Sequence, residues 1–124
     1  MKLFPSLQKR YTKERFTAVQ AQRLAQEIAF GPIVFQVSRL MLKFGIFRLL
    51  SDNREGLSLE QISQNTGLSK YATQVLLEAS LTIGTVLVKD DQYILAKAGW
   101  FLLNDEMAQV NMDFNQDVNY KGLF

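Results

Sequence analysis

The chain has 124 residues, of which 48% are hydrophobic and 21% charged, and this composition predicts one soluble globular domain with one core. It contains no cysteine and no histidine, which excludes disulfides, thiolate metal sites and a histidine general base. No apolar stretch is long enough for a signal peptide or a membrane span, so we expect a cytoplasmic protein without a membrane segment.

Basic residues gather in the first part of the chain. The formal net charge is +2, but residues 1–50 hold nine Lys or Arg against two acids, whereas residues 51–124 hold five against ten. Residues 1–16 are a basic arm in which the cations alternate with Phe4 and Tyr11. We expect a solvated tail here, with contact to nucleic acid or an anionic surface as the alternative.

An amphipathic helix is predicted from Ala18 to about Phe30, with Thr17 as its N-cap. Its apolar side follows a period of 3.6 residues and consists of Ala21, Leu24, Ala25, Ile28 and Ala29. The alanines would allow another helix to approach closely. Gly31 and Pro32 then interrupt the chain, and the proline is well placed for the first turn of the next helix.

That next helix, predicted over about residues 32–50, is apolar around nearly its whole circumference. Such a helix must be buried on nearly all sides, and a domain of this size is too small to surround it. We therefore expect part of its surface to meet a second copy of the chain or another domain, and we favour a homodimer. The alternative is that the chain's own helices cover it.

Residues 57–100 predict two short helices followed by a hairpin, which is the plan of a winged helix. The first helix begins with a Ser-x-x-Gln capping box at Ser58 and ends at Gly67, where a left-handed backbone is easily adopted. The second helix is capped by Ser69 and runs to Gly84. Two capped helices this close together indicate a helix-turn-helix.

A short hairpin is predicted from strands at residues 86–88 and 93–95, joined by an acidic turn at residues 89–92. Another helix is expected from Asn104, with apolar residues three to four positions apart. We interpret residues 104–124 as a connector toward a domain that is missing from a truncated chain. The expected fold class is mainly α with a small β-hairpin wing, a winged helix-turn-helix flanked by additional N- and C-terminal helices.

Winged helices commonly read DNA, but the charges here oppose that use. The predicted outer face of the second helix carries one cation, Lys70, one amide, Gln74, and the acid Glu78, which would repel phosphates. The expected wing carries Asp90 and Asp91, where a phosphate-contacting wing would carry Lys or Arg. We therefore expect no nucleic-acid partner and keep a DNA-binding transcription regulator as the alternative function.

The sequence also resembles a known family over about residues 17–103. Its motifs are the Phe-Gly-Ile-Phe segment at residues 44–47, the Ser-Leu-Glu-x-Ile helix from Ser58, the Gly-Leu-Ser turn at residues 67–69 and the Ala-Gly-Trp segment at residues 98–100. Together with the preceding apolar helix, they resemble the N-terminal dimerisation domain of class I S-adenosylmethionine (SAM)-dependent methyltransferases of the O-methyltransferase type.

This resemblance implies a domain, residues 17–103, that pairs with its twin and covers the substrate opening of a following Rossmann-like catalytic domain. The seven glycines are scattered singly, so no glycine-rich cofactor loop is present. We expect no catalytic, metal-binding or cofactor-binding residue in this chain, with SAM bound by the parent protein. The expected partners are a second copy, the catalytic domain and, through the parent, a small-molecule substrate. A plain adaptor without an enzymatic parent is a weaker alternative.

Two sets of candidate site residues follow from these expectations. The candidate dimer interface consists of apolar positions on the long helix and on the outer face of the second helix of the winged helix. These are Val34, Phe35, Val37, Leu40, Met41, Phe44, Leu77 and Leu81. The candidate substrate-lid contacts, which depend on the resemblance, are Phe30 and Phe35.

Overall fold

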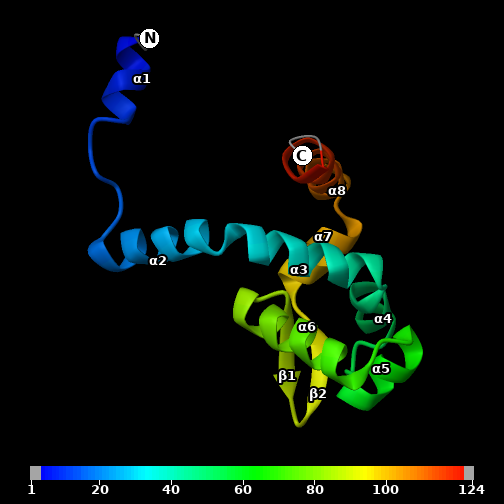
Figure 1. The fold of residues 1–124 in the computed structure, drawn as a ribbon. Coiled ribbons are helices and arrows are strands. Elements are labelled where there is room, and N and C mark those ends of the chain that lie inside the picture. Colours follow the sequence, from blue (N-terminus) through cyan, green and yellow to red (C-terminus); the bar gives the residue numbers. More distant parts are fainter. Residues whose placement is uncertain (1–3, 122–124) are drawn as a thin grey trace. The chain divides into compact units, whose positions relative to one another are not determined.

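A computed structural model describes residues 4–121, which form short helices and one two-stranded sheet (Figure 1). The chain divides into two compact units, the first ending at Pro32 and the second beginning at Ile33. The first unit holds α1 (Pro5–Arg10) and α2 (Ala18–Ala29). The second unit holds most of α3 and all the later elements.

The predicted start of α2 is confirmed by a complete capping box at Thr17. The Gln20 amide donates to the Thr17 hydroxyl oxygen over 3.2 Å, and the Thr17 amide donates to the Gln20 side-chain carbonyl over 3.0 Å. At the N-terminus of α2, two backbone amides that have no carbonyl partner within the helix thus gain a hydrogen-bond acceptor. The position at which α2 begins is therefore set by local hydrogen bonds.

The prediction of a single long helix over residues 32–50 is wrong. The chain instead forms α3 (Gly31–Lys43) and α4 (Ile46–Asp52), separated at Gly45, whose φ of 75° lies in the left-handed region. Glycine adopts this conformation without the steric cost that a Cβ would add. Because the chain changes direction here, Ile46, Phe47 and Leu50 of α4 enter the core of the second unit.

The predicted helix-turn-helix is confirmed as α5 (Leu59–Thr66) and α6 (Lys70–Ile83). Ser58 forms the expected capping box with Gln61, and the hydroxyl oxygen of Ser69 accepts a hydrogen bond from the Ala72 amide over 3.1 Å. Gly67 ends α5 in the left-handed conformation. Local hydrogen bonds thus place both helix starts where the sequence predicts them.

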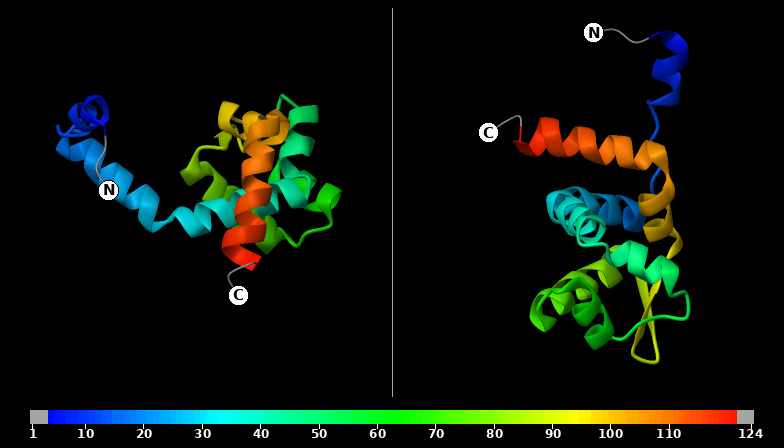
Figure 2. Two further views of the ribbon diagram at one scale, coloured as in Figure 1. Left: turned by 90° about the horizontal axis from the view of Figure 1, so that it is seen from above. Right: turned by 90° about the vertical axis from the view of Figure 1, so that its right-hand side faces the viewer.

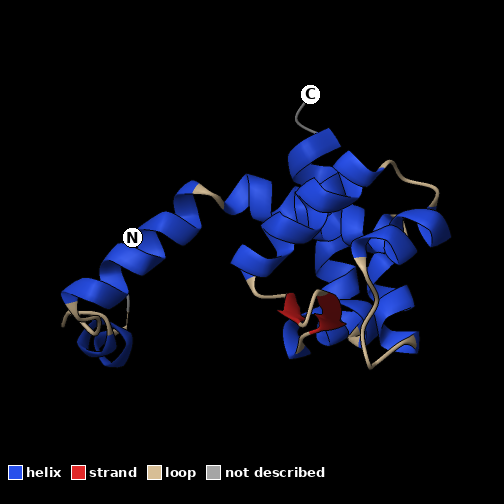
Figure 3. Cartoon of the chain, turned by 90° about the horizontal axis from the view of Figure 1, so that it is seen from below, coloured by secondary structure: helices blue, strands red, loops and turns tan. Residues whose placement is uncertain are grey.

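The predicted hairpin is confirmed as β1 (Val86–Lys89) and β2 (Gln92–Leu95), the two strands of the structure (Figure 3). The strands pair antiparallel, with Val86 opposite Leu95. A separate bridge joins Leu57 to Tyr93, and each of these two residues donates its amide to the carbonyl of the other. The segment before α5 is thereby attached to the outer edge of β2.

Two further helices follow the hairpin. The apolar segment around Trp100 forms α7 (Lys97–Asn104), and the predicted C-terminal helix is present as α8 (Glu106–Asn115), which continues as a π-helix, η1 (Gln116–Lys121). Within the second unit, α8 lies on the side of α7 opposite to the hairpin, as the two orthogonal views agree (Figures 1 and 2).

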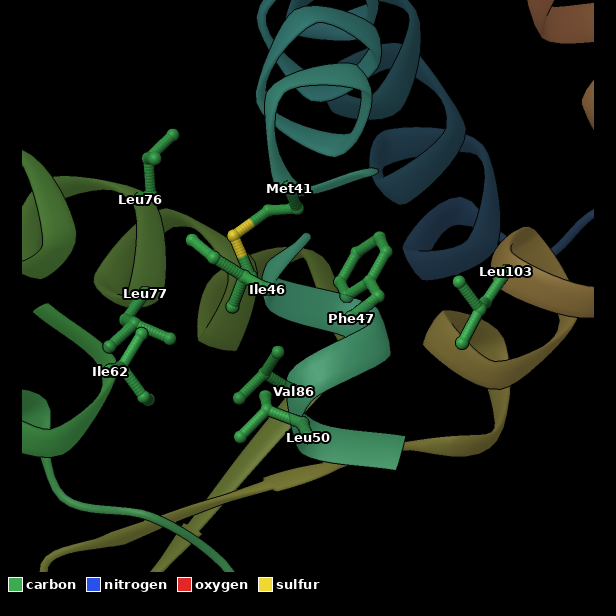
Figure 4. Packing of buried hydrophobic residues seen from close by; sticks show 9 residues of the cluster. All are labelled: Met41, Ile46, Phe47, Leu50, Ile62, Leu76, Leu77, Val86 and Leu103. Carbon is green, nitrogen blue, oxygen red and sulfur yellow. The ribbon is translucent and has the colours of Figure 1, made fainter. Parts of the chain in front are cut away.

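One core holds the second unit together, between α3, α4, α5, α6, α7 and β1 (Figure 4). Its buried apolar side chains are Met41, Ile46, Phe47, Leu50, Ile62, Leu76, Leu77, Val86 and Leu103. The fold class is therefore the predicted one, mainly helical with a small antiparallel hairpin in a winged-helix-like arrangement.

Candidate self-association surface

No residue of α2 is buried, although the helix is clearly amphipathic. Leu24 is 39% exposed and Ile28 is 70% exposed, and Ala21 and Ala25 lie on the same face at helical spacing. The polar side carries an ion pair between Arg23 and Glu27 at 4.0 Å. The apolar face of α2, defined as Ala21, Leu24, Ala25 and Ile28, is therefore formed but not covered by the other described residues of the first unit.

Three of the eight residues assigned to the dimer interface lie at or near the surface of the second unit. Val34 and Phe35 in α3 are half-buried, and Phe44, which follows α3, is 38% exposed. The Lys43 ammonium lies 5.9 Å from the centroid of the Phe44 ring, within the range of a cation–π contact. All three residues keep part of their surface exposed.

The other five residues belong to the chain's own core or pack against it. Met41 and Leu77 are fully buried and cannot contact a partner, so the prediction that they lie in the dimer interface is wrong. The remaining three are half-buried and pack on the core: Val37, Leu40 and Leu81.

Leu77 is buried because of the orientation of α6 about its own axis. The sequence predicts that Leu77 lies on the outer face of α6, but Leu77 is fully buried, whereas Val75 is 46% exposed. The buried face runs through Thr73, Leu77 and Ser80, with the Thr73 hydroxyl donating to the carbonyl of Ser69 over 2.8 Å. Two small polar residues, Thr73 and Ser80, therefore belong to the buried face of α6.

The outer face of α6 has the polar character expected from the sequence. Tyr71 is exposed, and the Gln74 side-chain amide donates to the Glu78 carboxylate over 3.0 Å. Burial raises the pKa of the Tyr93 phenol, and the negative charges of Glu78 and Asp91, with a smaller contribution from Glu60, raise that pKa further. The carboxylates of Glu78 and Asp91 therefore lie close enough to the Tyr93 phenol to influence its ionisation.

The two candidate lid residues lie in different units. Phe30 is the C-cap of α2 and is half-exposed, whereas Phe35 lies in the second turn of α3. Within residues 4–121, no group of three or more Asp and Glu side chains is arranged to hold a metal ion. No helix in the described part of the chain is long and apolar enough to cross a membrane.

Comparison with known proteins assigns the fold to a family. The family described as Dimerisation2-like domain matches residues 22–93. L-tyrosine C(3)-methyltransferase from Streptomyces lavendulae is 34% identical over 98 residues, which are 77% of this chain and 26% of that enzyme.

Solved structures give a similar result. The S-adenosylmethionine-dependent methyltransferase SibL is 26% identical, with a TM-score of 0.62 over 73% of this chain and 27% of SibL. LepI in complex with SAM matches with a TM-score of 0.65 over 89% of this chain and 27% of LepI, and at 19% identity it supports the fold alone.

The chain spans only about a quarter of the length of these relatives. The matched residues 22–93 run from α2, through the break at Gly45 and the helix-turn-helix, into β2, and so include most of the elements described above. Because the family matches these residues and the tyrosine methyltransferase is 34% identical, the chain belongs to the Dimerisation2-like domain family.

Proposed function

We propose that this chain is the dimerisation domain of a SAM-dependent methyltransferase and that it pairs with a second copy of itself. The observation that carries the proposal is the uncovered apolar face of α2. Helices of about 12 residues are marginal in water, and those in proteins are stabilised mainly by packing of their apolar face. A fully formed helix of 12 residues with no buried residue therefore requires a partner surface.

A second copy is the occupant that best fits this face. Ala21 and Ala25 are small, so the backbones of two facing helices can approach closely, while Leu24 and Ile28 supply apolar area. The family description supports self-association. Val34, Phe35 and Phe44 are the residues of the second unit that we propose to contribute to the same dimer.

The parent protein is proposed to be longer than this chain. Residues 17–103 would be the dimerisation domain, and residues 104–124 would connect it to a catalytic domain that binds SAM. The methyltransferase relatives, which are about three times as long as this chain, support this proposal. We further propose that Phe30 and Phe35 contact the substrate as part of a lid, and that the parent is cytoplasmic.

DNA binding is a weaker explanation of the helix-turn-helix. The Gln74 amide, which would be the best group for reading a base, is already bonded to Glu78. The turn of the hairpin places Asp90 and Asp91 at the tip of the wing, where phosphate oxygens would lie in a DNA complex. Both features favour assembly over DNA recognition.

Sedimentation velocity over a concentration series tests the proposal. The chain is expected to sediment as a dimer, and Leu24→Glu should shift it to a monomer because a carboxylate on the apolar face would be buried without a partner. Gln26→Glu adds the same charge on the polar side of α2, so it is the matched control and should leave the dimer intact.

The same data can contradict the proposal in two ways. A wild-type chain that remains monomeric at the highest concentration has no self-association surface. Equal weakening of the dimer by Leu24→Glu and Gln26→Glu would show that charge, and not the apolar face of α2, determines assembly. Circular dichroism of each variant checks that the second unit, which contains neither substitution, stays folded.

A further inference from the structure

The second unit contains a hollow of about 420 Å³ whose walls come from α3, α4, α7 and α8. Three cations line it: Arg39 and Lys43 from consecutive turns of α3, and Arg48 from α4. Its volume lies within the range of small-molecule binding sites, which is roughly 300–1,000 Å³. We refer to this hollow as the basic cavity.

The described lining of the basic cavity carries more positive than negative charge. Asp113 of α8 is the one acid among the described lining residues, and none of the three cations forms an ion pair with another described residue. Arg39 and Lys43 are four residues apart on one helix, an arrangement in which like charges repel. An anion in the cavity would relieve this repulsion.

The remaining walls are suited to an organic ligand. Leu42, Leu103 and Met112 contribute apolar surface from three different helices. The Gln109 side-chain amide donates to the carbonyl of Leu103, and this bond attaches the first turns of α8 to the end of α7. The cavity therefore combines a cationic side, an apolar side and a wall anchored by a hydrogen bond.

We propose that the basic cavity binds a small organic anion. The carboxylate or phosphate of the ligand would be held by Arg39, Lys43 and Arg48, because the guanidinium fork matches the geometry of both oxyanions. Its hydrocarbon part would lie against the apolar wall. Asp113 would accept a hydrogen bond from a hydroxyl or amine of the ligand, and it disfavours compounds that carry negative charge throughout. This binding site is independent of the proposed dimerisation.

Titrations of the 124-residue chain, followed by two-dimensional NMR of the amides, test this proposal with four probes: hexanoate, hexyl phosphate, acetate and inorganic phosphate. Both hexyl compounds are expected to bind saturably and to shift the signals of residues 109–113. Their affinity should exceed that of acetate and inorganic phosphate by about tenfold, because only they reach the apolar wall. The tighter of the two hexyl compounds identifies the preferred oxyanion.

Variants then locate the site. Arg48→Gln and Arg39→Gln should each lower the affinity for hexanoate or hexyl phosphate by about tenfold or more, because a charge-assisted hydrogen bond is lost. Arg54→Gln removes an arginine that does not line this cavity and should bind as the wild type does. The dimer-disrupting variant Leu24→Glu should also retain the ligand, which separates this proposal from the proposed function.

Three results would overturn the proposal. One is the absence of saturable binding by either hexyl compound at concentrations up to about 10 mM. Another is binding that Arg39→Gln and Arg48→Gln leave unchanged. The third is a short DNA duplex that binds far more tightly than either hexyl compound, with a steep salt dependence that the same variants reduce. That result would assign these cations to phosphate backbone contacts.

Discussion

Gly99 shows how one small residue allows α7 to pack against the hairpin. It is buried in the first turn of α7. A Cβ at this position would lie 2.5 Å from the backbone carbonyl oxygen of Thr85 and 2.6 Å from a methyl group of Leu95. The Thr85 carbonyl also accepts a hydrogen bond from the Ala96 amide over 3.0 Å, so it is held in place. The absence of a side chain at Gly99 is therefore required by the close approach of two backbones.

We predict that Gly99→Ala destabilises the chain by about 1–3 kcal/mol, the usual range for overpacking a filled site. The better helix propensity of alanine, about 1 kcal/mol, offsets only part of this cost. The measurement is urea unfolding followed by circular dichroism. Gly31→Ala is the control, because nothing lies within 4 Å of a Cβ there, and it should be neutral or slightly stabilising. Equal effects of the two substitutions would contradict the packing role of Gly99.

At the scale of elements, the features set by local chemistry were predicted from the sequence. The N-caps at Thr17 and Ser58 and the helix ends at Gly67 and Gly84 depend on neighbouring residues alone, and all four are present. The break at Gly45 was missed because apolar residues continue on both sides of it, and an isolated glycine is tolerated within a helix at a cost of about 1 kcal/mol. Periodicity cannot distinguish a long buried helix from two shorter ones.

The orientation of α6 was missed for a related reason. Apolar residues occur around much of this helix, so hydropathy allows more than one core face, and the observed face includes Thr73 and Ser80. A threonine is acceptable in the core because its hydroxyl bonds to the carbonyl four residues earlier. The Ser80 hydroxyl has no hydrogen-bond partner among the described residues, although it is buried. Packing against α5 and β1, and not the pattern within α6, determines its rotation.

The hairpin turn provides a prediction at this scale. Asp90 and Asp91 both have positive φ, 52° and 61°, which is the geometry of a two-residue type I′ turn. Asn-Gly suits this turn better, because glycine has no steric cost at positive φ and the adjacent like charges are removed. The double variant Asp90→Asn, Asp91→Gly should raise the free energy of unfolding by about 1 kcal/mol.

Urea unfolding measures this gain, and Glu55→Gln is its control. Glu55 is an exposed acid outside the hairpin, so this substitution removes a charge without changing the turn and should stay within about 0.5 kcal/mol of the wild type. A double variant no more stable than Glu55→Gln would show that the two aspartates adopt the left-handed conformation without measurable cost.

At the scale of the whole molecule, the candidate surface was predicted only in part. The sequence indicated both the amphipathic character of α2 and a self-associating domain, but it placed the interface on the apolar helix that follows. Much of that segment is instead occupied by its own core, as the full burial of Met41 and Phe47 shows. The composition indicates that a small domain cannot cover all of its apolar surface. Only the packing shows which apolar side chains enter the core and which stay exposed.

The central claim, that a second copy covers the apolar face of α2, is tested most directly by amide hydrogen exchange over α2 (Ala18–Ala29) at low and high protein concentration. Dimerisation predicts slow exchange that becomes slower as concentration rises, because the helix is stable only when its apolar face is packed. Exchange of these amides at the rate of an unstructured peptide at every concentration would contradict the claim.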